Sequence, residues 1–598
     1  MRQEFTGRLV RAGILAALLA CPGLAAAFDL TLEVRGADLR DRLQAASRLS
    51  GLAGQDGAEA QEIIAAAQAD YANLTAALYD AGHFGGVIRI LVDGREAARI
   101  SQLDLPGSVA RVTVSVETGP AFRLGAASIA PVAPGSELPA GFAPGQPAQL
   151  GVVRDTVRTG IEGWRAQGHA RARLSDQQIT ARHRADQLDV SIRLDPGRVY
   201  RFGDLVIRGA SDVRPERIRE IAGLPTGARY DPEALDLATR RLRRTGTFSA
   251  ATLSDAETDG PDDTLDIVLD ISDRPKRSFG FGAEIASFEG LSVSGYWQHR
   301  NLLGGAERLR FEAEISGIGG DSGGADGRLS ARFDRPATFS QDNDFYVEAE
   351  ALRRDDVDFT TTRVAIEAGV VRYATAQRTY EFGLGLVWGR SEDAFGRRDY
   401  SLVTLPLGVE FDHRDDRLNA HRGWFLDLEL IPFYALSGIP SGLIANADLR
   451  GYRSFGTGDR LTLAGRFQLG SLSGLPLAQA PADALYYSGG GGTVRGQPFQ
   501  SNGIDLPGGL RSGGRSFLGL SGEVRFDVTD TIGAVGFVDA GYIGAESFPD
   551  GSGTWHSGAG LGLRYDTGIG PIRFDVAFPV SGPGDDGVQI YIGIGQAF

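Results

Sequence analysis

The feature that most constrains the fold is the alternation of apolar and polar residues in short segments of the C-terminal half. From residue 278 to residue 598, short strand-like segments follow one another with turn residues between them and no helical periodicity. In residues 520–528 one face carries Leu520, Val524, Phe526 and Val528, and the other carries Ser521, Glu523, Arg525 and Asp527. This spacing indicates strands with one apolar and one polar face.

Two architectures alternate in this way, a soluble β-sandwich and a transmembrane β-barrel. In a sandwich the apolar face forms the core, whereas in a barrel it faces lipid and the polar face lines a wet lumen. Residues 276–598 are too many for one sandwich. At about 20 residues per strand with its connection, they fit a transmembrane barrel of about 16 antiparallel strands.

Closure of such a barrel requires the first and last strands to pair. The first strand is expected at GFGAEIAS (280–287) and the last at IYIGIGQAF (590–598). The alternation places Ile590, Ile592, Ile594 and Phe598 on one face, and a terminal aromatic suits a closing strand. Gly593 and Gly595 weaken packing at this seam, so they favour sideways opening; the alternative is that they only ease curvature.

The N-terminal half contains a repeat. GPAFRLG (119–125) returns as GRVYRFG (197–203), and a looser copy of the unit begins at Tyr79. A helical face in the second unit carries Val153, Val157, Ile161 and Trp164. In the third unit Asp231 is placed to cap a helix that begins at Pro232.

These patterns predict three α+β domains, each with the order strand, helix, helix and two strands. The expected domain boundaries are 28–118, 119–196 and 197–275, with the barrel at 276–598. The proline- and glycine-rich stretch at 130–149 is predicted to be a loop inside the second domain.

Residues 1–27 have the pattern of a secretory signal peptide, with arginines before the apolar run AGILAALLA and small residues before Phe28. Lipoprotein processing at Cys21, the only cysteine, is the alternative. Cleavage before Phe28 leaves no cysteine and therefore excludes disulfides and thiolate sites. The net charge of −15 argues against a nucleic-acid partner.

The glycine-rich stretch GGGGTVRGQPF (489–499) contains a single arginine, Arg495. A phosphate-binding loop would need a following Lys-Ser/Thr and a helix, and neither is present. Two interpretations of this stretch remain: a plain flexible loop, and a loop that positions one charge. An arginine in a water-poor lumen needs a carboxylate partner. Glu523 lies on the polar face of its strand, whereas the pattern around Asp539 leaves its orientation open.

Catalysis finds little support in the sequence: it has no His-Glu-x-x-His, and its Gly-x-Ser-x-Gly spacing, in GDSGG (320–324), falls where no helix is predicted and so is not a nucleophile elbow. The cluster of Asp412, His413, Asp415 and His421 is better explained by strand-end polar residues than by a metal site. We therefore expect a non-enzymatic protein without a cofactor or metal.

Four blocks in order resemble the BamA/TamA superfamily of outer-membrane assembly factors. They are HRNLLGGAERLRFEAE (299–314), FDHRDDRLNAHRGWFLDLEL (411–430), YYSGGGGTVRGQPFQS (486–501) and GLGLRYDTGIGPIRFDVAFPV (560–580). The resemblance spans essentially the whole mature chain. It implies three periplasmic POTRA domains and a barrel in the outer membrane of a Gram-negative bacterium. Three such domains with a short barrel are similar to TamA, which implies a TamB-like inner-membrane-anchored partner.

The resemblance also implies a role for the loop that carries Arg495. Val494, Arg495 and Gly496 match the family's conserved motif, in which the arginine contacts acidic residues of the two following strands; these map to Glu523 and Asp539, with Asp539 favoured. One departure stands out, because the family has an aromatic where this chain has Gln497, and Phe499 follows two residues later.

The function implied is insertion of outer-membrane β-proteins such as autotransporters. Unfolded clients would pair with POTRA edge strands and with the barrel seam. The alternative is a two-partner-secretion-type transporter that exports a dedicated protein. A passive porin would not need the long N-terminal half.

Overall fold

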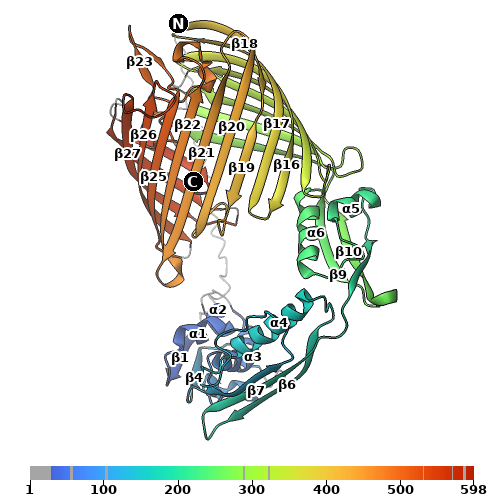
Figure 1. Ribbon diagram of the computed structural model, residues 1–598. Helices are drawn as coiled ribbons and strands as arrows, with labels where there is room; N and C mark the ends of the chain where they lie inside the picture. Colours follow the sequence, from blue (N-terminus) through green and yellow to red (C-terminus); the bar gives the residue numbers. More distant parts are fainter. Residues whose placement is uncertain are drawn as a thin grey trace, which may run out of the picture. The chain divides into compact units, whose positions relative to one another are not determined.

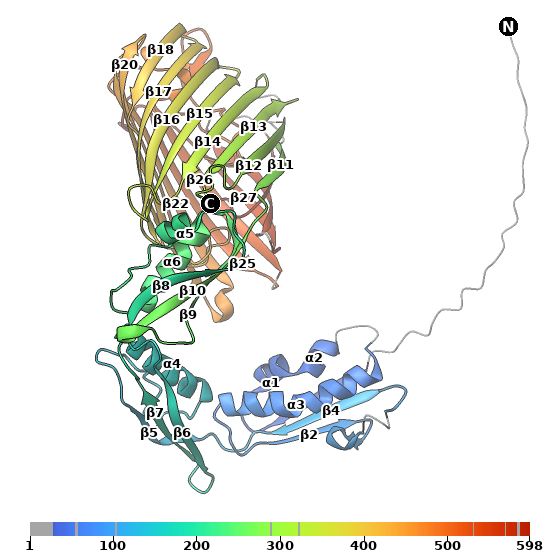
Figure 2. The ribbon, with the colours of Figure 1, turned by 90° about the vertical axis from the view of Figure 1, so that its right-hand side faces the viewer.

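The computed structural model describes residues 28–53, 58–101, 105–286, 290–320, 323–529, 531–568, 570–582 and 587–598. The predicted signal peptide, including Cys21, lies outside these residues. The chain divides into two compact units, which are described separately. The first consists of the residues up to Arg201 with Gly227–Glu233 and Pro261–Thr264, and the second consists of the remainder. Figures 1 and 2 show the elements of each.

The first domain is a four-stranded sheet with the order β1-β4-β2-β3 and three helices. Its elements are β1 (Asp29–Arg35), α1 (Arg40–Ala46), α2 (Arg48–Leu52), α3 (Ala60–Asp80), β2 (Val87–Val92), β3 (Arg95–Glu96), the 3-10 helix η1 (Ala97–Arg99) and β4 (Arg111–Glu117). The alternating Val112, Val114 and Val116 of β4 are buried, as predicted, and pack in one core with Ile64 and Leu78 of α3.

The second domain has a three-stranded sheet, β5-β7-β6, and one helix. Its elements are β5 (Arg123–Ala130), α4 (Leu150–Ala166), β6 (Arg173–Arg182) and β7 (Gln187–Asp195). The predicted face of α4 does pack on the sheet, with Val153 buried and Val157, Ile161 and Trp164 against the core.

The prediction of two helices in this domain is wrong, because residues 131–149 form only a loop. Pro131, Pro134, Pro139, Pro144 and Pro147 lie in it. Each proline lacks a backbone N–H and pushes the preceding residue toward extended conformation, so no helical turn can propagate through this stretch.

The third domain has a three-stranded sheet with the order β8-β10-β9 and two helices. Its elements are β8 (Arg201–Arg208), α5 (Pro215–Ala222), α6 (Pro232–Arg244), β9 (Phe248–Asp255), the 3-10 helix η2 (Pro261–Asp263) and β10 (Thr264–Asp273). Asp231 accepts a 2.9 Å hydrogen bond from the backbone N–H of Glu233 at the start of α6, as predicted. Among the described residues, none of the helices combines the length and apolarity needed to cross a membrane.

The three sheets occupy residues 29–117, 123–195 and 201–273. We propose that the domain boundaries lie in the connections between them, near residues 118, 196 and 275, where the sequence repeat places them.

The C-terminal part is one antiparallel sheet that runs in chain order from β11 to β29, with only the β23-β24 hairpin outside it. Its elements are β11 (Arg277–Ala286), β12 (Gly290–His299), β13 (Arg308–Ile318), β14 (Asp326–Arg335), β15 (Asn343–Asp355), β16 (Phe359–Thr375), β17 (Arg378–Asp393), β18 (Gly396–Thr404), β19 (Leu407–Asp412), β20 (Gly423–Ser437), β21 (Gly442–Phe455), η3 (Thr457–Asp459), β22 (Leu461–Ser473), η4 (Leu477–Gln479), η5 (Ala482–Ala484), β23 (Ile504–Leu506), β24 (Leu510–Ser512), β25 (Ser516–Asp527), β26 (Ile532–Gly544), β27 (Thr554–Tyr565), β28 (Ile572–Ser581) and β29 (Gln589–Ile594).

Two of the 17 sheet segments belong to one barrel strand. Both β18 and β19 pair with β17 on one side and with β20 on the other. The break falls at Leu405 and Pro406, where the proline has no N–H for the ladder. The 17 segments therefore form 16 barrel strands, in agreement with the sequence prediction.

The two faces of these strands settle the choice between sandwich and barrel. In β25 the apolar Leu520 and Val524 are 43% and 49% exposed, whereas Glu523 and Arg525 are 2% and 5% exposed. The apolar face is therefore outside and the charged face inside, which is the pattern of a transmembrane barrel. Figure 1 shows these strands side by side in the wall of a barrel.

The two ends of the sheet approach each other without pairing. Cα atoms of β11 and β29 come within 8 Å, but no hydrogen-bonded ladder joins these strands among the described residues. The predicted pairing of the first and last strands is therefore not formed there. Strand β29 ends at Ile594. The next residue, Gly595, has a φ of +90° and turns the chain, so residues 595–598 do not continue along β11.

Phe598 does not follow the predicted face either. Ile590 and Ile592 are exposed on the outside, as predicted, and the side chain of Ile594 lies outside the described part. Phe598 is only 8% exposed and packs inside with Ala420, Tyr452 and Ala464. The alternation ends at Gly595, because its left-handed conformation breaks the two-residue period.

Within the second unit, α6 is fastened to the turn between β14 and β15. Arg241 donates from Nε and Nη2 to both carboxylate oxygens of Asp342, at 2.7 and 2.6 Å. Arg217 of α5 adds a 2.7 Å hydrogen bond to the carbonyl of Pro336 in the same turn. The hydrogen bonds from Arg241 lower the pKa of Asp342 below its ordinary value.

Replacement of Arg241 should loosen this attachment. Arg241→Gln removes hydrogen bonds to a charged group and should cost about 1.5–3 kcal/mol locally. Hydrogen-exchange protection of residues 336–342 should fall, while Arg243→Gln, at an exposed arginine of the same helical turn, should leave it unchanged. Equal protection in both variants would contradict the attachment.

The same contact should depend on pH with a defined sign. Because the folded-state pKa of Asp342 is lowered, its contribution is complete above the ordinary carboxyl value of 3.8 and is lost as the pH falls through the lower folded value. Protection factors of residues 336–342 should therefore decrease in acid for the wild type and stay flat for Arg241→Gln. A wild type that is insensitive to acid would rule this out.

Candidate functional site

The loop between β22 and β25 folds back into the lumen through a hydrogen-bonded turn. Ser488 and Asn502 exchange main-chain hydrogen bonds of 3.0 and 2.9 Å at its base. The backbone N–H of Gly489 donates to Oγ1 of Thr493 at 2.9 Å, and that of Gly490 donates to the carbonyl of Gln497 at 3.0 Å. The glycine run is therefore a defined turn, and it differs from a flexible linker.

Arg495, at the tip of this turn, is 2% exposed and meets three carboxylates. Its Nε and Nη2 donate to the two oxygens of Asp539 at 2.7 and 3.0 Å, and its backbone N–H donates to the same side chain at 3.1 Å. Its Nη1 donates to Glu523 at 2.7 Å and to Asp575 at 3.4 Å. The guanidinium carbon lies 3.6 Å from the ring centroid of Phe537, a cation–π contact.

The structure thus brings Arg495 together with both partners named from the sequence. Asp539 on β26 makes the two-point contact and Glu523 on β25 the one-point contact. Asp575 on β28 was not named as a partner, although its place on the polar face of residues 572–578 is a signal that could have found it. Phe537 could not have been found from pattern, because both faces of β26 are apolar there.

Val494 and Gly496 fit the loop tip closely against the barrel wall. Val494 is fully buried. Gly496 has a φ of +92°, and a Cβ there would lie 2.4 Å from the carbonyl oxygen of Phe578, so only glycine fits. On β27, a Cβ at Gly558 would lie 1.9 Å from the carbonyl oxygen of Arg495. The motif and the wall therefore match in shape as well as in charge.

Gln497 directly follows Gly496 at the loop tip. It is fully buried, and its Nε2 donates to the carbonyls of Ser557 on β27 and Ser581 on β28, at 2.9 and 3.0 Å. Phe499 is only half-buried, beside a second lumen cavity of about 310 Å³. The amide thus fastens the loop tip by hydrogen bonds to the last strands.

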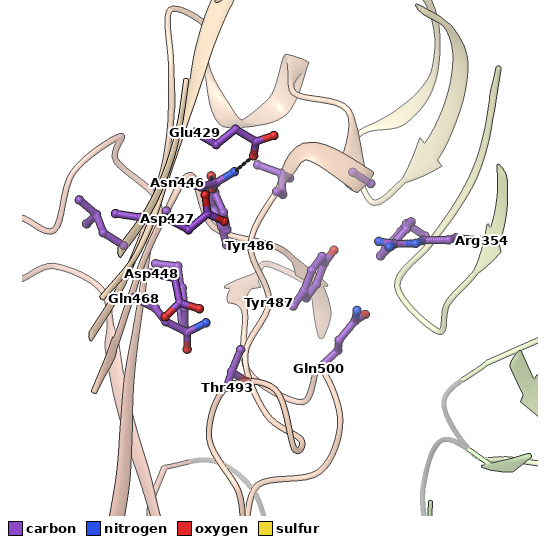
Figure 3. A pocket seen from close by; sticks show the side chains of 17 residues that line it. Arg354, Asp427, Glu429, Asn446, Asp448, Gln468, Tyr486, Tyr487, Thr493 and Gln500 are labelled. Carbon is purple, nitrogen blue, oxygen red and sulfur yellow. Dashed lines mark hydrogen bonds between the residues drawn. The ribbon is translucent and has the colours of Figure 1, made fainter. Parts of the chain in front are cut away.

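A cavity of about 360 Å³ adjoins the loop inside the barrel. Figure 3 shows Asp427, Glu429 and Asp448 on one wall and Arg354 on the opposite side, with Tyr487 and Gln500 of the loop between them. Nδ2 of Asn446 donates to Glu429 at 2.9 Å. The lining combines these polar side chains with apolar ones, among them Phe359, Leu485 and Phe517.

Of the residues named for the seam, Gly593 lies in β29, and Gly595 and Phe598 follow that strand. Gly593 stands opposite Arg573 in the ladder, and a Cβ there would lie 3.2 Å from the Nε of Arg573. Gly595 makes the turn described above, and Phe598 lies inside rather than in the seam.

The acidic and histidine cluster before β20 is a set of turn contacts. Both oxygens of Asp412 accept hydrogen bonds from Arg414 at 2.9 Å. Oδ1 of Asp415 accepts from the backbone N–H groups of His421 and Arg422, at 3.0 and 3.1 Å. These carboxylates hold the turn between β19 and β20.

A barrel of 16 strands with an apolar exterior, a charged lumen and an inward loop, preceded by α+β domains, defines an outer-membrane β-barrel protein with periplasmic domains. An Omp85 superfamily domain model matches residues 301–598, and a POTRA model, described as a surface antigen variable number repeat, matches residues 200–274. The chain belongs to the Omp85 superfamily.

Solved structures share this fold. The chain is similar to BamA from Haemophilus ducreyi lacking POTRA domains 1–3, at 17% identity and a TM-score of 0.59, over 79% of this chain and 100% of that chain. It is also similar to CdiB from Acinetobacter baumannii, at 13% identity and a TM-score of 0.51, over 79% of this chain and 89% of that chain.

The family sets the place and the general role. The protein lies in the outer membrane of a Gram-negative bacterium with its POTRA domains in the periplasm, and it takes part in protein insertion or translocation there. Its fold is that of a transport and assembly family and not of a known enzyme family.

Removal of the loop arginine should destabilise the loop more than the barrel. Arg495→Ala leaves buried carboxylates without their partner and should cost about 3–5 kcal/mol. Arg495→Lys keeps the charge but loses the two-point contact with Asp539, so its cost should be smaller. Urea unfolding in detergent measures both, and heat-modifiable migration in SDS gels reports whether the barrel still forms.

Arg354→Ala serves as the matched control, because Arg354 lines the same lumen on the opposite side. It should leave the urea midpoint nearly unchanged. Equal midpoints for wild type and Arg495→Ala would show that the buried charge contacts contribute nothing to the loop.

Proposed function

We propose that this protein is a TamA-like assembly factor that inserts β-barrel proteins, such as autotransporters, into the outer membrane. The three α+β domains ahead of the barrel support the TamA-like assignment, since the number of such domains distinguishes the branches that the sequence resembles. A TamB-like inner-membrane-anchored protein is the proposed partner of these domains.

The observation that carries the proposal is the seam. Strands β11 and β29 face each other without a hydrogen-bonded ladder among the described residues. Backbone N–H and C=O groups without partners are costly at membrane depth, so each edge favours pairing with another strand. A client strand that enters from the periplasm can satisfy these edges by main-chain hydrogen bonding.

Clients first meet the periplasmic domains. In the second domain β6 is an edge strand with nearly all of its residues exposed, including Leu174 and Ile179. An unfolded strand can add to such an edge through its backbone, and exposed apolar side chains provide weak selectivity. This mode tolerates many client sequences, which suits an assembly factor.

The loop around Arg495 supports the barrel during this process. Its contacts with Glu523, Asp539 and Asp575 tie the loop to three of the last strands, so that the wall beside the seam keeps its shape while β29 has no ladder to β11 among the described residues. Val494 and Gly496 provide the close fit, and we propose a positioning role for all three motif residues.

A reversible lock of the seam tests the proposal. Cysteine pairs with one member in residues 278–282 and one in 589–593 can be introduced into a protein whose only cysteine lies in the predicted signal peptide. Oxidation should abolish client insertion into proteoliposomes, and reduction should restore it. Full insertion by the locked protein would sink the proposal.

The control pair joins strands that stay paired. Gly282 and Ser294 are ladder partners on β11 and β12, so a disulfide between cysteines there should leave insertion intact. Planar-bilayer conductance of the locked protein tests the rival function. A dedicated exporter should conduct through the lumen and keep secreting with the seam locked, whereas an insertase should not.

A further inference from the structure

Residues 595–598, which follow β29, lie inside the lumen; we call them the inner segment. The backbone N–H of Gly595 donates to the carbonyl of Pro571 at 2.7 Å, and that of Gln596 donates to the carbonyl of Leu418 at 3.2 Å. The Nε2 of Gln596 also donates to Oδ1 of Asn419 at 2.9 Å. The inner segment therefore has a specific binding place on turns of the barrel.

A first path of charges joins the inner segment to the loop. Arg495 donates to Oε1 of Glu523 at 2.7 Å. The other oxygen of Glu523 accepts a 2.8 Å hydrogen bond from Nε of Arg525. The Nη2 of Arg525 then donates to the main-chain oxygen of Phe598 at 3.1 Å. Nη2 also lies 2.8 Å from Glu523, so Arg525 contacts the carboxylate and the inner segment through the same Nε–Nη2 edge.

A second path runs through the neighbouring strands. Arg495 donates to Oδ2 of Asp575 at 3.4 Å, and the other oxygen of Asp575 accepts from Nη1 of Arg564. The Nε of Arg564 donates to Oε1 of Gln596 at 2.7 Å. Both paths have the same order, from Arg495 to an acid, to a second arginine and to the inner segment.

A direct contact links the loop to β29 itself. The backbone N–H of Gly496 donates to the hydroxyl of Tyr591 at 3.2 Å, and the Tyr591 ring packs beside Val535, Phe537 and Ala577. The loop therefore touches the last strand in its middle and, through the two arginines, the residues that follow it.

The geometry makes these contacts dependent on one another. Arg525 and Arg564 are 5% and 4% exposed, so each must keep a carboxylate partner. A guanidinium is planar and presents its donors in a fixed fork, so an arginine that turns toward one acceptor turns away from another. Glu523 and Asp575 are each shared between Arg495 and one of these arginines.

We propose that Arg525 and Arg564 are positioning residues that couple the Arg495 loop to the inner segment. With the loop bound, both arginines donate to residues 596 and 598 and hold the chain after β29 inside the lumen, so that β29 lies near β11 without a ladder to it among the described residues. When the loop leaves, Glu523 and Asp575 draw the arginines away, and the inner segment is released. The loop thereby controls whether β29 is available for pairing at the seam. This inference rests on the proposed function of the seam.

The test measures the seam directly in the full-length protein without any client. One cysteine in residues 278–282 and one in 589–593 are oxidised in phosphatidylethanolamine–phosphatidylglycerol vesicles, and the yield of the disulfide is read from gels. The variants are Gln596→Ala, Arg564→Lys and Arg495→Lys. Gln596→Ala removes only an uncharged contact, so it leaves every buried ion pair in place.

Each variant should raise the disulfide yield about threefold or more relative to wild type, because the released strand can then align with β11. Gln468→Ala, at a lumen-facing glutamine of β22 outside both paths, should match wild type. The combination of Arg495→Lys with Gln596→Ala should give no more than the larger single effect, because the two residues act along one path.

Two results would overturn the coupling. One is a wild-type yield in Gln596→Ala; the other is an Arg495→Lys effect that adds fully to that of Gln596→Ala. A merely structural role of the arginines would lower the urea midpoint in Arg564→Lys without changing the seam yield of the folded protein. If the coupling is measured but the locked seam still inserts clients, the proposed function fails while this inference stands.

Discussion

A guanidinium ion stays charged even when it is buried, so its burial is costly unless carboxylates pair with it, and the lumen of this barrel is arranged around that requirement at Arg495. Asp539 holds the arginine at two points, and Glu523 and Asp575 complete its shell. The three acids come from β25, β26 and β28, so the ion pairs tie the loop to most of the C-terminal wall. Loop conformation and barrel shape therefore depend on the same buried charges.

Two opposing effects act at the seam: the cost of unpaired strand edges and the contacts that hold the inner segment in the lumen. Strand edges at membrane depth require partners, yet β29 turns inward at Gly595 and leaves β11 without a ladder among the described residues. Contacts of the inner segment with Arg525 and Arg564 offset part of that cost. A barrel that is stable and still has a reactive edge follows from this balance, and the proposed insertion of a β-protein would use such an edge.

Much of the fold could be predicted because short sequence patterns indicate which face of a strand or helix is apolar. Alternation in residues 520–528 predicted the outward face of β25, and the apolar spacing of residues 153–164 predicted the buried face of α4. The failures had local causes with wider effects. Prolines in residues 131–149 prevent the second helix predicted there. The turn at Gly595 places Phe598 inside the barrel instead of on the predicted outer face. Asp575 was visible as a lumen-facing residue, but pattern could not show which inward carboxylates meet one arginine.

The sequence by itself determined the class of the molecule: an apolar exterior over strands of period two, α+β repeats before it, and one arginine delivered by a glycine turn. These are properties of neighbouring residues, so they are written in short windows of the chain. Only the tertiary structure decided the partners. Barrel closure brings Arg495 to Asp575 across 80 positions and Arg525 to Phe598 across 73, because strand order and stagger in the whole cylinder, rather than any local pattern, set which inward side chains face each other.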